Sequence, residues 1–135
     1  MIPHLSERAL ILAPQGRDAQ VALAMLEEAG LHGIIASSLR EMVTLLTEGA
    51  GFALVTEEAL AGADLSALSV WINAQPEWSD FPFVLLTLRG GGLEQNPSAG
   101  RYLDLLGNVT FLERPFHPTT LVSLARAALR ARRRP

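Results

Sequence analysis

Short apolar runs alternate along this chain with longer segments in which apolar residues recur every three or four positions. The first pattern is typical of buried β-strands, and the second of amphipathic helices that pack against them. The apolar runs cover about residues 9–13, 33–36, 52–55, 83–87 and 109–112. This alternation predicts five β-α units in which each helix returns the chain to the same end of a parallel sheet.

The amphipathic segments predict helices over about residues 17–29, 38–48, 65–75 and 98–106, followed by a last helix from about 118. Local signals support these boundaries. Ser38 and Glu41 have the spacing of a capping box at a helix start. Gly49 is suited to end that helix, and Pro118 is suited to the first turn of the last one.

Together these elements predict an α/β fold of the flavodoxin-like (βα)5 type, a three-layer sandwich with a five-stranded parallel sheet in the order 2-1-3-4-5. A chain of 135 residues with 49% hydrophobic residues is expected to form one domain over residues 1–135. In such a sheet, functional side chains gather at the carboxyl ends of the strands. We therefore examine the residues that follow each apolar run.

Composition excludes several kinds of site. The sequence has no cysteine, which removes disulfides, thiolate metal sites and thiol nucleophiles. Its apolar runs are far shorter than the roughly 18 residues of a membrane span, and its net charge is only -3 although five of its 11 arginines fall between Arg126 and Arg134. We expect a cytoplasmic protein with no cofactor, no metal ion, and neither nucleic acid nor membrane as a partner.

The strand ends carry a distinctive set of residues, which is Pro14, Gln15, Thr56, Thr87, Phe111, Arg114 and Pro115. With the spacing of the five units, this set resembles the response-regulator receiver domain family over nearly the whole chain. In that family an acidic pair after the first strand holds magnesium, and an aspartate ending the third strand accepts phosphate. A threonine or serine ends the fourth strand, and a Lys-Pro pair follows an aromatic residue of the fifth.

The match is partial, because Thr87, Phe111 and Arg114-Pro115 agree with the pattern and all three carboxylate positions do not. Proline and glutamine cannot replace the carboxylates that magnesium prefers. A threonine hydroxyl without a neighbouring base is a poor nucleophile, and its phosphate ester would be stable. The resemblance therefore implies a degenerate receiver, or pseudo-receiver, that is not an enzyme. An ion pair between Arg114 and a nearby glutamate (Glu57, Glu58 or Glu113) would hold the site shut.

Receivers commonly pair through the face formed by their fourth helix, fifth strand and fifth helix. By this resemblance the predicted interaction surface consists of Arg101, Tyr102, Leu105, Phe111, Arg126 and Arg130. Residues 54–60 and 106–115 are similar to receiver-like segments at the N-termini of bacterial sensor histidine kinases. The expected function is protein–protein interaction or homodimerisation in a bacterial two-component system, with the arginine-rich last helix as a joint to PAS or kinase modules.

Two alternatives remain open on the sequence. Glu57 or Glu58, which follow the third strand, could accept phosphate in place of Thr56. The strand-end positions Pro14, Thr56, Thr87 and Arg114 could instead surround a pocket that senses a small anion or another small molecule. Mass measurement after treatment with a phosphodonor separates the first alternative, and ligand-dependent thermal shifts separate the second.

Overall fold

The sheet has five parallel strands in the order β2-β1-β3-β4-β5, as predicted. A computed structural model describes residues 5–76, 80–87 and 99–133. The strands are β1 (Ala9–Leu12), β2 (Gly33–Ile35), β3 (Phe52–Thr56), β4 (Phe83–Thr87) and β5 (Val109–Glu113). Every residue of β1, β3 and β4 is buried. This explains why these three strands are continuous apolar runs instead of alternating ones.

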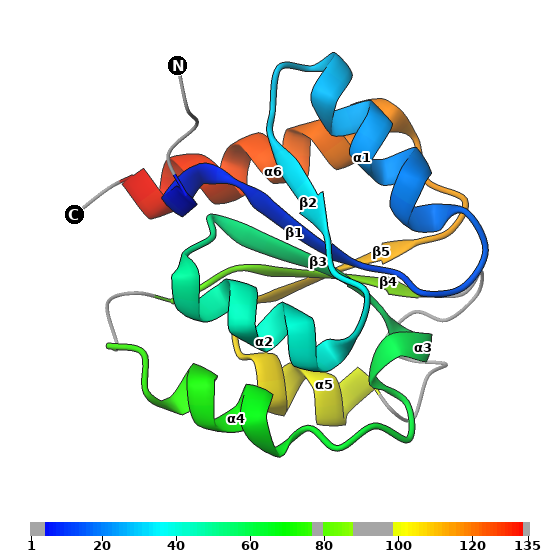
Figure 1. Cartoon of the computed structure of the whole chain (residues 1–135). Helices are drawn as coiled ribbons and strands as arrows, with labels where there is room; N and C mark the ends of the chain where they lie inside the picture. Colours follow the sequence, from blue (N-terminus) through cyan, green and yellow to red (C-terminus); the bar gives the residue numbers. More distant parts are fainter. Residues whose placement is uncertain (1–4, 77–79, 88–98, 134–135) are drawn as a thin grey trace.

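Helices cover both faces of the sheet (Figure 1). The helical elements are η1 (Leu5–Glu7), α1 (Asp18–Glu28), α2 (Leu39–Glu48), α3 (Glu57–Leu60), α4 (Ser66–Asn73), α5 (Ala99–Leu106) and α6 (Pro118–Arg133). α1 and α6 lie on one face, and α2, α4 and α5 lie on the other. The predicted three-layer sandwich is therefore confirmed.

Each face of the sheet has its own hydrophobic core. On one face, α1 and α6 contribute Leu26 and Leu121 to a cluster with Ile11 and Leu54 of the sheet. On the other, Met42 of α2 packs in a second cluster together with residues of α4 and α5. The alternation of side chains along β1 and β3 divides these strands between the two cores.

Several local signals of the sequence act as predicted. The Ser38 hydroxyl accepts a hydrogen bond from the Glu41 amide at 3.1 Å and caps α2. The Glu41 carboxylate accepts one from the amide of Ser37, one residue before the cap. Gly49 follows α2, and its φ of 133° lies in the region that favours glycine. Pro118 is the first residue of α6.

Two arginines tie helix ends to distant segments. Arg8 donates from Nε to the Gly49 carbonyl at 2.8 Å and from Nη2 to the Leu45 carbonyl at 3.2 Å, so it satisfies carbonyls at the end of α2. Arg126 of α6 donates to the Ala29 carbonyl at 3.1 Å, just after α1. Both contacts place a cation at a helix C-terminus, where the helix dipole favours it.

The far end of α6 packs closely on the start of β3. Gly51, which precedes β3, has no room for a side chain. A Cβ atom there would collide with Cδ2 of Leu129 and would lie 2.9 Å from the Ser6 carbonyl oxygen. The Leu129 side chain is buried, so α6, η1 and the start of β3 meet with little free space between them.

Every predicted boundary that the structure describes lies within two residues of the observed one. Two short elements, η1 and α3, were not predicted. Ser98, the predicted start of the fourth helix, lies outside the described residues. In the described part of the chain, no helix is long and apolar enough to cross a membrane.

Candidate functional site

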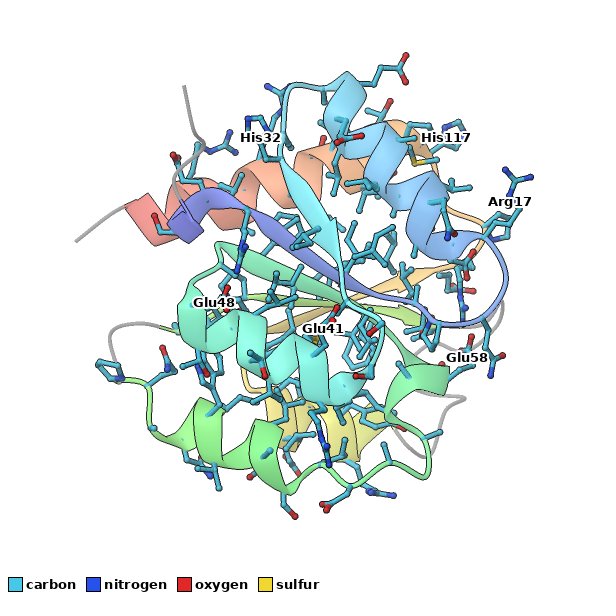
Figure 2. All side chains as sticks on the ribbon, viewed as in Figure 1. Arg17, His32, Glu41, Glu48, Glu58 and His117 are labelled. Carbon is cyan, nitrogen blue, oxygen red and sulfur yellow. The ribbon has the colours of Figure 1, made fainter. Side chains whose placement is uncertain are left out.

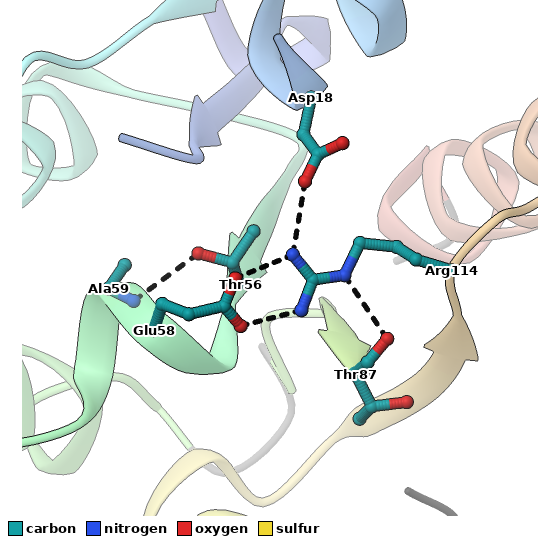
Figure 3. A network of polar contacts seen from close by, with 6 residues as sticks. All are labelled: Asp18, Thr56, Glu58, Ala59, Thr87 and Arg114. Atoms are coloured by element: carbon teal, nitrogen blue, oxygen red, sulfur yellow. Dashed lines mark hydrogen bonds and ion pairs between the residues drawn. The ribbon is translucent and has the colours of Figure 1, made fainter. Parts of the chain in front are cut away.

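The carboxyl ends of the strands bring together residues that are up to 96 positions apart in the sequence (Figure 3). Thr56 ends β3, Thr87 ends β4, and Arg114 follows the last residue of β5. Glu58 comes from α3, and Asp18 is the first residue of α1. We call these five residues the Arg114 site.

The Arg114 guanidinium is the centre of this site. Its Nη1 and Nη2 donate to the two Glu58 carboxylate oxygens at 2.6 and 2.5 Å, which makes a bidentate ion pair. Nη1 also donates to Oδ2 of Asp18 at 3.0 Å. Nε donates to the Thr87 carbonyl at 3.1 Å, and the Arg114 backbone amide donates to the same oxygen at 3.0 Å. One side chain thus joins α1, α3 and β4 to the segment after β5.

The ion pair is shielded from water and shifts the titration of both partners. The Arg114 side chain is 13% exposed, and the Glu58 side chain is 24% exposed. The hydrogen bond from Arg114 lowers the pKa of Glu58, with the guanidinium charge acting in the same direction and burial opposing it. The hydrogen bond to Glu58 raises the pKa of Arg114 in turn. Both groups are charged at neutral pH.

The two threonines have different local roles. The Thr56 hydroxyl accepts a hydrogen bond from the Ala59 amide at 3.3 Å, which makes Thr56 the N-cap of α3. Its side chain is buried, so the hydroxyl serves the backbone and is not presented to solvent. The Thr87 hydroxyl is buried and has no hydrogen-bond partner among the described residues, while its carbonyl oxygen accepts from Arg114.

The residues present do not fit the magnesium ion that the receiver resemblance implies. Pro14 and Gln15 are exposed and offer no carboxylate, and Thr56 caps a helix. The two carboxylates that do reach the edge, Asp18 and Glu58, contact a guanidinium instead. Within the described residues, no group of three or more histidine, aspartate or glutamate side chains could hold a metal ion.

Only some residues of the predicted interaction surface lie together on the outside of the protein. Arg101 of α5 is exposed, and Leu105 and Phe111 are half-buried near the β5 edge. Tyr102 is only 5% exposed and belongs to the core, so its side chain does not lie on that surface. Burial and the charge of Glu57 raise the pKa of Tyr102.

Arg126 and Arg130 lie on the same side of α6, because they are four residues apart in one helix. Arg126 points toward α1 and bonds the Ala29 carbonyl, so it lies between α6 and α1 and is separate from α5. Arg130 is exposed. Arg134 lies outside the described residues.

Sequence reasoning missed Asp18 as a member of the site. The pairing of Arg114 with one of the neighbouring glutamates was anticipated, and Glu58 proves to be that partner. Asp18 showed only the signal of an acidic residue in the first turn of a helix, which the helix dipole alone explains. Its position directly after the β1 connection, at the same sheet edge, is the feature that could have identified it.

Known proteins resemble this chain at the level of the fold. No protein-family model matches the sequence, and no curated protein matches it. Solved structures do match. The signal receiver domain of a signal transduction histidine kinase from Syntrophus aciditrophicus has a TM-score of 0.73 at 24% identity, over 95% of this chain and 93% of that one.

Two further solved structures have a similar fold. A CheY-like response regulator receiver domain protein from Methanospirillum hungatei JF-1 has a TM-score of 0.70 at 17% identity, covering 93% of this chain and 95% of its own. The beryllofluoride-activated NtrC4 receiver domain dimer has a TM-score of 0.69 at 19% identity, covering 92% and 97%. This chain therefore has the receiver-domain fold of two-component signalling proteins.

Proposed function

We propose that this chain is a single receiver-like domain that is not phosphorylated, is not an enzyme, and signals through protein–protein contacts in a bacterial two-component system. The observation that carries the proposal is the Arg114–Glu58 ion pair at the strand ends. It fills the edge where the resemblance expects a metal ion and a phosphoryl group. The capping role of Thr56 supports the same conclusion, because its hydroxyl already has a backbone partner.

The contacts of Arg114 argue against both alternatives from the sequence. Glu58 directs both carboxylate oxygens at the guanidinium, so attack on a phosphodonor would require this pair to break. A sensor for anions needs positive charge that is available to the ligand. The Arg114 charge is already matched by Glu58 and Asp18, which leaves it little attraction for an added anion.

The surface that we propose for pairing is formed by α5 and β5. In the described part of the chain β5 is an edge strand, since it pairs there with β4 alone. On α5, Arg101 is exposed and Leu103 is a large apolar side chain that is 42% exposed. Exposed apolar residues beside charged ones are common at interfaces. With Leu105 and Phe111 they define the proposed surface. Burial excludes Tyr102 from it. The contact of Arg126 with Ala29 excludes Arg126 and also Arg130, which lies on the same side of α6.

Structures with this fold support pairing and a kinase context. The NtrC4 receiver domain forms a dimer, and the Syntrophus aciditrophicus receiver domain comes from a histidine kinase. We therefore propose a second copy of this domain as the first partner to test, and PAS or histidine kinase modules as the neighbours that it serves. The chemistry of the Arg114 site makes this pairing independent of phosphorylation.

The test of the proposal is incubation with magnesium and acetyl phosphate followed by intact-protein mass spectrometry. The expected result is no mass gain that hydroxylamine removes, because no described carboxylate of the Arg114 site is free of the guanidinium. A hydroxylamine-labile gain of one phosphate would overturn the proposal. The Glu58→Gln variant is the matched control, since it shows whether any such phosphate sits on Glu58.

A further inference from the structure

The Arg114 guanidinium lies between carboxylates that come from α1 and α3, at the edge where the fold would place a divalent cation. We propose that this guanidinium takes the place of the metal ion and permanently closes the edge. The inference rests on the proposed function and deepens it. It says that the protein carries its own cation, so that neither a metal ion nor a phosphoryl group sets the conformation of the strand ends.

Distances support the substitution. Nη1 of Arg114 lies 2.6 Å from Oε2 of Glu58 and 3.0 Å from Oδ2 of Asp18. One nitrogen thus contacts two carboxylates from different elements, much as a hard cation is shared between oxygen ligands at about 2.0–2.6 Å. Without the guanidinium, two negative charges would face each other across a small gap. Such a pair is what magnesium binds through, together with water.

The Arg114 side chain also donates a hydrogen bond, which a metal ion cannot do. Its Nε donor and the Arg114 backbone amide both bind the Thr87 carbonyl, so the end of β4 is fixed to the segment after β5. A bound metal exchanges with solvent, whereas a side chain that is 13% exposed and bonded to three elements stays in place. The edge is therefore held in one arrangement under all metal concentrations.

The experiment is a thermal melt of four proteins with EDTA and with about 10 mM magnesium chloride. They are the wild type, Arg114→Gln, Arg114→Lys and the double variant Arg114→Gln/Glu58→Gln. We expect magnesium to raise the melting temperature of Arg114→Gln by about 3–5 °C, because the exposed carboxylates gain a cation. The other three should shift by less than about 1 °C, since each has a cation of its own or lacks one carboxylate.

Two results would overturn the proposal. One is a magnesium shift in the wild type as large as that in Arg114→Gln, and the other is no shift in Arg114→Gln. If Arg114→Gln is unfolded in EDTA, refolding by magnesium, followed by circular dichroism, is the readout with the same two outcomes. The proposed function can fail separately, because the acetyl phosphate experiment on the wild type does not depend on how the variants respond to magnesium.

Discussion

Asp18 and Glu58 share one guanidinium, but they do so unequally. Glu58 makes two charge-assisted hydrogen bonds and Asp18 makes one. The Asp18 side chain is also more exposed, at 36% against 24% for Glu58. Charge-assisted bonds are stronger when both partners are shielded from water. Replacement of Glu58 should therefore lower the free energy of unfolding more than replacement of Asp18.

At this scale we predict a pH-dependent contribution from Glu58. Its pKa is lower in the folded protein than the value of about 4.3 in an unfolded chain, so folding favours the charged form. The stability from the ion pair is present in full above that value and is lost as the pH falls through the lowered pKa. Glu58→Gln should cost about 1–3 kcal/mol at pH 7 and progressively less below about pH 4.

The measurement is urea denaturation of the wild type and of Glu58→Gln between pH 3 and pH 7. Glu48→Gln is the matched control. Its side chain is 54% exposed, its contact with Arg8 is 3.6 Å long, and it lies at the opposite end of the molecule from Glu58 (Figure 2). The control should change stability by less than about 0.5 kcal/mol. A difference between wild type and Glu58→Gln that is constant with pH would contradict the assignment.

Residues also show where prediction from sequence stops. Glu58 could be anticipated as a partner of Arg114 because both were placed at the same sheet edge. Asp18 could not be distinguished from an ordinary acidic residue at a helix start. Tyr102 was placed on a surface by resemblance, but its aromatic ring lies in the core between the sheet and the helices. A four-residue helix cannot show periodicity, which is why α3 was missed.

At the scale of elements, α2 depends on its first residues. Its N-cap, Ser38, satisfies the Glu41 amide, which otherwise has no partner in the first turn. Replacing Ser38 by alanine should destabilise the protein by about 1 kcal/mol, whereas glycine should cost only a few tenths. Thermal denaturation of the two variants measures the difference. A Ser38→Ala variant as stable as the wild type would show that the hydroxyl contact does not contribute to stability.

The two faces of the sheet explain why the larger elements were predictable. Each helix buries one stripe of apolar side chains, such as Ala22 and Leu26 of α1 or Met42 and Leu46 of α2. Such stripes are visible as helical periodicity in the sequence. β1, β3 and β4 were equally clear, because burial on both faces makes them uninterrupted apolar runs.

At the scale of the whole molecule, the test concerns self-association. We predict that the domain forms a dimer through the surface of α5 and β5, and that Arg101→Glu weakens it. Sedimentation velocity over a wide concentration range should show at least about a tenfold increase in the dissociation constant, equivalent to about 1.4 kcal/mol. The cause is charge reversal at an exposed position of α5.

The matched control is Arg40→Glu, the same charge change at an exposed position of α2, which is outside the proposed surface. It should leave the dissociation constant unchanged. A wild type that stays monomeric at every concentration would refute self-pairing. In that case the surface would have to bind a different protein.

The long helix α6 connects the two ends of the molecule. It starts four residues after Arg114 and is 16 residues long, or about 24 Å. Its first turn follows the segment fixed to Glu58 and Thr87, and its far end rests on Gly51 without free space. The helix is thus held near both ends, by the fixed segment before its first turn and by the packing of Leu129 against Gly51. A displacement of α6 along its axis would therefore disturb both the packing against Gly51 and the segment that Arg114 fixes to Thr87.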